Sequence, residues 1–356
     1  MITSIQSTKN NPTIKSLNSL KNYPWFPPLI SAVFFFILSA LFFLALGRQP
    51  FTLLGQVFMG AFGDMYSFTE TLVKTSPILL CALAAAVPAR LGLLTVGASG
   101  QFYLGAIFGA FVALNAHGAP IYLVLPAMLL GGAIGGALWS IFAGFLRARF
   151  EVNETLVTLL LNYIGAQIVD YLVYGPWRDT ANLGWPATPA FPDTAKLPAF
   201  GSSRLHWGIV IGITLAFSLH FLFTKTRIGL MLRVMKSNRK VALWAGLNTS
   251  MATILLMGLG GALAGLAGIC ETSAIQGRLQ SGIAANFGLT GFLVAWMSRQ
   301  HLLRIIPYSL AMGALLAASD ALQLFAQLPA ASAVVLQALL FLAVFSATRL
   351  FPGKGV

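Results

Sequence analysis

The sequence predicts an all-α polytopic membrane protein with about ten transmembrane helices, and two observations support this fold class. The chain has 356 residues, of which 57% are hydrophobic and 9% are charged, with a mean hydropathy of +0.81. Roughly a quarter of the residues in soluble domains are charged, so this composition excludes an ordinary soluble enzyme. Long uncharged runs also separate the charges, and residues 91–146 contain no Asp, Glu, Lys or Arg. Because a membrane-crossing helix needs about 20 apolar residues, this run alone accommodates two helices.

The uncharged runs place the helices in order along the chain. A polar arm, residues 1–28, precedes a first apolar run that is longer than a signal-peptide core, so we expect this run to remain as a helix. The second helix carries Glu70 and Lys74 four residues apart, which predicts an ion pair across one helical turn. The third is rich in glycine and the eighth is short, so both are expected to be broken or re-entrant. The ten expected helices lie at residues 29–47, 68–88, 92–115, 121–146, 154–174, 207–224, 251–270, 286–298, 305–324 and 331–348.

Basic residues are distributed unevenly between the loops. With the N-terminus inside, sixteen of the 22 Lys and Arg residues fall in inner loops and five fall in outer loops. Such an excess is typical of cytoplasmic loops, so we predict that both termini are cytoplasmic. We interpret the net charge of +13 as an orientation signal and not as a sign of nucleic-acid binding. The expected organisation is one transmembrane domain over residues 29–350, with an external loop at about 175–206 and a cytoplasmic loop at about 225–250.

The sequence contains no recognisable catalytic or metal site. The glycine-rich phosphate loop that binds ATP is absent, since Gly353-Lys354 is followed by glycine and not by Ser or Thr. Cys81 and Cys270 are far apart in sequence, and the four histidines are scattered without a metal-ligand spacing. We therefore expect no metal, no cofactor and no enzymatic activity in this chain.

Glycine is abundant and clustered. For the clusters at 131–136 and 258–268, close packing between helices is the expected role. The segment 92–101 differs, because it combines glycines with Thr95, Ser99 and Gln101 beside a long apolar run. Interrupted helices in membranes are tolerated where protein or a watery cavity satisfies the freed backbone, and they often mark transport sites. The segment is therefore a candidate for the translocation pathway.

The cytoplasmic loop at 225–250 is basic and contains no acidic residue. Its spacing predicts a short amphipathic helix, with glycines near both ends and Asn238 suited to cap the helix N-terminus. One interpretation is a basic loop that rests on anionic lipid. The length of the loop favours the other interpretation, a surface on which a partner protein docks.

Three sequence blocks resemble a known family, the ABC importer permeases of bacteria for branched-chain amino acids, simple sugars and nucleosides. The blocks are LLCALAAAVPARLGLLTVGASGQFYLG at 79–105, VNETLVTLLLNYIGAQIVDYLVYGPWRD at 152–179, and TRIGLMLRVMKSNRKVALWAGLN with GGALAGLAG within 226–268. The second and third blocks are most similar to the nucleoside and simple-sugar branch. Thr95 and Ser99 stand where the family usually has Asn and Glu, and this change alters the polarity expected there.

The resemblance implies a transport subunit that works with partners. A cytoplasmic ABC ATPase would dock on the loop, a second and non-identical permease would complete the pathway, and an extracytoplasmic binding protein would deliver a nucleoside or related small polar solute. The location implied is the bacterial cytoplasmic (inner) membrane. The residues expected to couple to the ATPase are Arg227, Gly229, Arg233, Asn238, Arg239 and Gly246. Those expected along the pathway are Gly97, Ser99, Gly100, Gln101, Asn162 and Gly291.

Other functions remain open at this point. Within the same family, the substrate could be a sugar or a branched-chain amino acid. Outside it, the chain could be a self-sufficient secondary transporter that carries protons on Asp320 or Asp170. A membrane scaffold without transport is the third alternative, and the polar interrupted segment argues against it.

Overall fold

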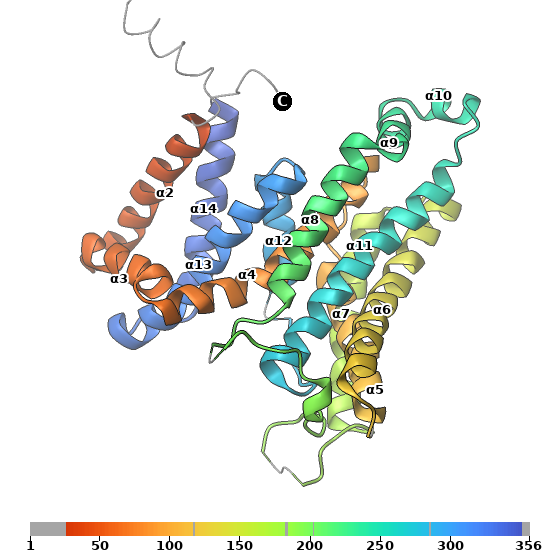
Figure 1. Cartoon of the computed structure of the whole chain (residues 1–356). Coiled ribbons are helices and arrows are strands. Elements are labelled where there is room, and N and C mark those ends of the chain that lie inside the picture. Colours follow the sequence, from red (N-terminus) through yellow and green to blue (C-terminus); the bar gives the residue numbers. More distant parts are fainter. Residues whose placement is uncertain (1–25, 117, 182–183, 202, 285, 351–356) are drawn as a thin grey trace, which may run out of the picture. The chain divides into compact units, whose positions relative to one another are not determined.

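The computed structural model describes residues 26–116, 118–181, 184–201, 203–284 and 286–350, and its ordered elements are helices (Figure 1). The polar arm expected at 1–28 therefore lies almost entirely outside the described residues. The helices are α2 (Phe26–Ala45), α3 (Pro50–Phe62), α4 (Met65–Ala86), α5 (Ala98–Asn115), α6 (Ile121–Phe150), α7 (Glu154–Tyr174), α8 (Gly208–Lys225), α9 (Arg227–Ser237), α10 (Arg239–Trp244), α11 (Thr249–Glu271), α12 (Phe287–Met297), α13 (Leu302–Ala326) and α14 (Ala331–Leu350). Short turns of other helix types are η2 (Pro88–Leu91), η3 (Asp193–Ala195) and η4 (Thr272–Gln276).

The expected fold class is confirmed. Within the described residues, nine helices are long and apolar enough to cross a membrane. The eighth expected helix is present as α12, which has only 11 residues and is about half the length that a crossing requires. The third expected helix begins at Ala98 and not at residue 92, because residues 92–97 are not helical.

Helix α3 was not predicted from the sequence. Its 13 residues lie in a segment expected to be an outer loop. The segment is apolar but too short for a membrane crossing, so a search for long apolar runs passes over it. Pro50 begins the helix, where a missing N–H costs no hydrogen bond.

The described chain forms two compact units. The first contains the residues up to Gly60 together with those from Ala318 onward, and in it α2 packs along α14. The second contains residues 61–317 and holds both features that the sequence singled out, the interrupted segment and the basic loop. The expectation of one permease domain over residues 29–350 stays a prediction.

Helix α4 lies at the centre of the second unit, with an almost continuous run of buried residues from Thr69 to Ala86. Glycines on its neighbours allow close approach. A Cβ atom on Gly260 of α11 would lie 2.6 Å from the carbonyl oxygen of Ala84, and one on Gly291 of α12 would lie 2.6 Å from Cβ of Cys81. Both positions therefore require glycine for this packing.

The two glycine clusters serve the packing role expected of them. Helices α5, α6 and α11 meet through glycine, and a Cβ atom on Gly265 would overlap the carbonyl oxygen of Gly132. A Cβ atom on Gly136 would likewise overlap the carbonyl oxygen of Gly261. The helix backbones touch directly, which is how small residues hold helices together where no water drives association.

The loops of the second unit gather at two ends in the alternation that the sequence predicts. At one end, Lys236 donates to the Ala89 carbonyl (3.2 Å) and Arg90 donates to the Gln300 carbonyl (3.1 Å). At the other end, Phe191 N–H donates to the Gly277 carbonyl at 2.8 Å. The assignment of the first end to the cytoplasm rests on the charges and stays a prediction.

The loop expected to be external is packed against its own end of the unit. The Leu197 N–H donates to Ser273 Oγ at 2.9 Å, and Arg204 pairs with Glu70 at 3.5 Å. The helical spacing predicted that Glu70 pairs with Lys74. In the structure, Glu70 instead pairs with Arg204 of this loop. His206 is buried, and burial lowers the pKa of its imidazole to about 4, so the ring is neutral at physiological pH.

Candidate functional site

The second unit contains a break between helices, the interruption, defined as residues 92–97 between η2 and α5. Gly92 has a left-handed backbone with φ of 81° and ends η2. The extended residues that follow cannot form the hydrogen bonds of a helix, and an unpaired backbone group costs several kcal/mol in a membrane interior. Their partners come from α7, which lies about 60 residues further along the chain.

Side chains on one face of α7 bind the backbone of the interruption. Glu154 Oε1 accepts from the Leu94 N–H at 3.1 Å, and Thr155 Oγ1 donates to the Leu94 carbonyl at 2.7 Å. Thr158 Oγ1 accepts from the Val96 N–H at 3.3 Å. Protein side chains therefore satisfy the backbone of the interruption at Leu94 and Val96.

Asn162 completes the set of contacts at the start of α5. Its side-chain amide donates to the Val96 carbonyl at 2.9 Å, and its Oδ1 accepts from the Gly100 N–H at 2.7 Å. Glu154, Thr158 and Asn162 are spaced four residues apart, so they share one face of α7. This polar i, i+4, i+8 spacing in an apolar helix is the signal by which Thr158 could have been found from the sequence.

Five of the six predicted pathway residues come together around the interruption. A Cβ atom on Gly97 would meet Cβ of Thr158 at 2.6 Å, and one on Gly100 would meet the Leu161 carbonyl at 2.8 Å, so both glycines lie against α7. Gln101 is buried and donates to Ser140 Oγ of α6 at 3.1 Å. Ser99 and Asn162 are the other two, and Ser99 contacts Gly288 at the start of α12. Gly291, the sixth residue, packs against α4 one turn further along.

The basic loop forms two helices, α9 and α10, where the sequence predicted one. We call residues 225–250 the coupling segment. Asn238 lies between the helices and caps α10, since its Oδ1 accepts from the N–H groups of Lys240 (3.0 Å) and Val241 (3.2 Å). The predicted capping role is confirmed. Gly246 follows α10 with φ of 74°, a conformation that favours glycine.

The other predicted coupling residues have different surroundings. Arg227 is exposed at the start of α9, and Gly229 packs directly on the backbone of Phe223. Arg233 bonds within its own helix, from Nε to the Gly229 carbonyl at 3.3 Å. Trp244 was not singled out from the sequence, although it is 90% exposed at the end of α10.

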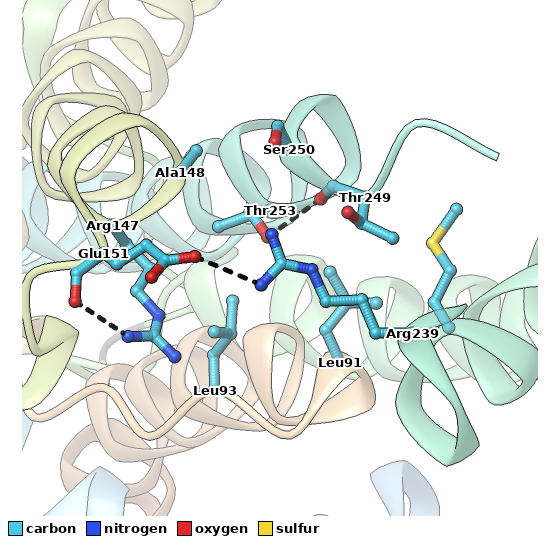
Figure 2. Close-up of a pocket in the computed structure, with 10 residues that line it drawn as sticks. Leu91, Leu93, Arg147, Ala148, Glu151, Arg239, Thr249, Ser250 and Thr253 are labelled. Carbon is cyan, nitrogen blue, oxygen red and sulfur yellow. Dashed lines mark hydrogen bonds and ion pairs between the residues drawn. The ribbon is translucent and has the colours of Figure 1, made fainter. Parts of the chain in front are cut away.

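A pocket of about 300 Å³ lies beside the coupling segment (Figure 2). Figure 2 shows the side chains of Glu151 and Arg239 extending toward one another across it, and their ion pair measures 3.5 Å. Arg147 pairs with Glu154 at 3.2 Å and donates to the Glu151 carbonyl at 3.3 Å. The lining residues come from the end of η2, the interruption, the end of α6, α9, α10 and the start of α11: Leu91, Leu93, Arg147, Ala148, Glu151, Met235, Arg239, Thr249, Ser250 and Thr253.

The fold and site define a multi-pass α-helical membrane protein with an interrupted helix and a basic helical loop. Among the described residues, no group of three or more His, Cys, Asp or Glu is placed to hold a metal ion. Residues 67–345 match the family described as the branched-chain amino acid transport system permease component, and the chain belongs to this family.

Curated relatives lie in the sugar and nucleoside branch. The glucose ABC transporter permease protein TsgB13 of Haloferax volcanii is 29% identical over 327 residues, which cover 88% of this chain and 85% of the relative. The guanosine ABC transporter permease protein NupP of Bacillus subtilis is 28% identical over 293 residues, which cover 81% of this chain and 83% of the relative. The nucleoside ABC transporter permease protein NupB of Lactococcus lactis subsp. cremoris is 29% identical over 281 residues, which cover 75% of this chain and 76% of the relative. The resemblance drawn from the sequence blocks is confirmed.

Proposed function

We propose that this chain is the transmembrane subunit of an ABC importer that moves nucleosides or a related small polar solute inward by alternating access. The family match and the relatives named for ABC transport of sugars and nucleosides support the importer class. The observation that carries the proposal is the coupling segment, which is basic, carries the exposed Trp244 at the end of α10, and contacts η2, the turn before the interruption.

A separate ATPase supplies the energy in this proposal. The ATPase docks on the coupling segment, and its closure moves α9 and α10. The residues that carry this contact are Arg227, Gly229, Arg233, Asn238, Arg239 and Gly246. A second, non-identical permease completes the pathway, and an extracytoplasmic binding protein delivers the solute in the bacterial cytoplasmic membrane. The segment contains no acidic side chain, so it favours a partner surface rich in carboxylates.

The pathway in this proposal runs beside the start of α5, where Ser99 is half-buried between α5 and α12. Gly97, Gly100, Gln101 and Asn162 position that helix start through the contacts described above. A sugar is the second candidate substrate, because one of the relatives is named for glucose. A hydroxyl side chain suits either ligand, since both nucleosides and sugars present hydroxyl groups.

Uptake by proteoliposomes that contain the whole complex tests the proposal. We expect ATP-dependent uptake of labelled guanosine or adenosine, with labelled glucose and leucine as the alternative substrates. A hydrolysis-deficient ATPase subunit provides the control and should abolish uptake. Uptake that survives with this control would instead indicate a secondary transporter, for which Asp320→Asn should abolish transport.

A further inference from the structure

We propose that Arg147, Glu151 and Glu154 are positioning residues that transmit movement of α10 to the interruption. This inference rests on the proposed function and names a physical connection within it. The three side chains link the coupling segment to the backbone of residue 94 through α6 and the start of α7. The sequence patterns alone assigned no role to Arg147, Glu151 or Glu154.

The inner part of the connection is held firmly. The side chain of Glu154 is 11% exposed, and each of its two oxygens has a different partner. Oε2 pairs with Arg147 Nε at 3.2 Å, and Oε1 accepts from the Leu94 N–H at 3.1 Å. Charge-assisted hydrogen bonds of this kind are about twice as strong as neutral ones. A displacement of the end of α6 therefore acts directly on the interruption.

The outer part of the connection can be made and broken. Arg147 also donates to the Glu151 carbonyl at 3.3 Å, and Glu151 is the residue that ends α6, with φ of 55°. The carboxylate of Glu151 then reaches Arg239, and these two side chains are 75% and 63% exposed. Exposed ion pairs contribute little to stability, so this pair separates at little cost. The pocket of about 300 Å³ behind it leaves space for α10 to approach α6 or withdraw.

A second contact joins the same segment to η2, the turn that precedes the interruption. Lys236 of α9 donates to the Ala89 carbonyl of η2 at 3.2 Å, just before Gly92. The coupling segment is therefore connected both to Leu94 within the interruption and to the turn that precedes it. A rotation of α9 and α10 changes the geometry of the interruption while the α7 contacts hold its register.

The test measures uptake per ATP hydrolysed in the reconstituted complex. Mutations along a coupling network change the coupling by about 0.5–2 kcal/mol, so we expect Glu151→Gln and Glu154→Gln each to lower this ratio by about two- to thirtyfold. The ATPase should still co-purify, because neither residue belongs to the coupling segment. Glu151→Asp and Glu154→Asp, which keep the carboxylates, should lower the ratio less than the glutamine variants, an outcome that a purely structural role does not predict because glutamine preserves the shape of the side chain and aspartate does not.

Asp193→Asn provides the matched control, since it removes an exposed ion pair with Lys196 at the opposite end of the unit. Its ratio should equal that of the wild type. The inference is wrong if the wild-type complex is coupled but Glu151→Gln and Glu154→Gln leave the ratio unchanged, or if the aspartate variants are as defective as the glutamine variants. Absence of ATP-dependent uptake by the wild type would instead contradict the proposed function.

Discussion

Asn162 illustrates how one side chain supports an irregular backbone inside an apolar bundle. Its amide group donates to the Val96 carbonyl and accepts from the Gly100 N–H. Without these bonds both groups would be buried with no partner, at a cost of about 1–3 kcal/mol each. Asn162, a polar residue in the middle of an apolar helix, therefore has a structural role that does not depend on any role in transport.

Replacing Asn162 tests this purpose. We expect Asn162→Ala to lower the free energy of unfolding in detergent by about 2–5 kcal/mol, because two backbone groups lose their partners. The measurement is the thermal unfolding of the purified chain followed by fluorescence. Asn115→Ala is the matched control, since the Asn115 amide is exposed and bonds only to its own helix. Equal stability of the two variants would contradict the assignment.

Thr95 and Ser99 have different surroundings, although both belong to the segment that the sequence indicates as part of the pathway. Thr95 is buried within the interruption, whereas Ser99 is half-buried and faces the start of α12. The exchange of the family's usual carboxylate for a hydroxyl at residue 99 therefore changes polarity at a helix–helix contact close to the proposed pathway. The spacing of the motif could not distinguish these two environments.

At the scale of elements, the contact between α6 and α11 depends on glycine to an unusual degree. Gly132 and Gly136 of α6 face Gly261 and Gly265 of α11, and the backbones meet with no side chain between them. Interhelical distances this short allow many van der Waals contacts, which substitute for the hydrophobic effect inside a bilayer.

A single methyl group should separate these helices. We expect Gly265→Ala to cost about 3 kcal/mol or more, because the added Cβ would overlap backbone atoms that cannot rotate away. The yield of monodisperse protein in size-exclusion chromatography measures the effect. Gly55→Ala is the control, since no atom lies within 4 Å of a Cβ at that position of α3. A normal yield for Gly265→Ala would show that the helices are not in backbone contact.

The elements also show which parts of the fold were predictable. Long apolar helices were located from the sequence, because a bilayer selects each span by its own length and composition. Helix α3 was missed because it is too short for that rule. The division of the coupling segment into α9 and α10 was missed as well, although Asn238 was identified as a cap, since the sequence did not reveal a helix on its N-terminal side.

At the scale of the whole molecule, the distribution of basic residues has two uses. It predicts the orientation of the chain, and it concentrates six of the 22 Lys and Arg residues in the coupling segment. The apolar face of α10 adds Trp244 to this basic surface. Trp and Arg are enriched in interface hot spots, and α10 carries one of each, Trp244 and Arg239.

Charge reversal in the coupling segment tests assembly with the ATPase. We expect Arg233→Glu with Arg239→Glu to reduce co-purification of the ATPase by about tenfold or more, because the two introduced carboxylates then repel a partner surface that is rich in carboxylates. Membrane insertion should be unchanged. Arg233→Glu alone separates docking from the ion pair of Arg239, since Arg233 bonds only within α9. Lys196→Glu at the opposite end is the control, and full assembly of the double variant would exclude docking on this segment.

The amino-acid sequence by itself determined that this protein is an α-helical membrane permease, where its long helices lie, and that residues 92–101 do not form a simple helix. These properties depend on composition over short stretches, and the bilayer acts on each stretch separately. Only the tertiary structure decided that α7 supplies the hydrogen bonds of the interruption and that Glu154, Arg147 and Glu151 connect it to α10. Hydropathy does not encode which distant side chain meets which backbone group, because that depends on how the helices pack.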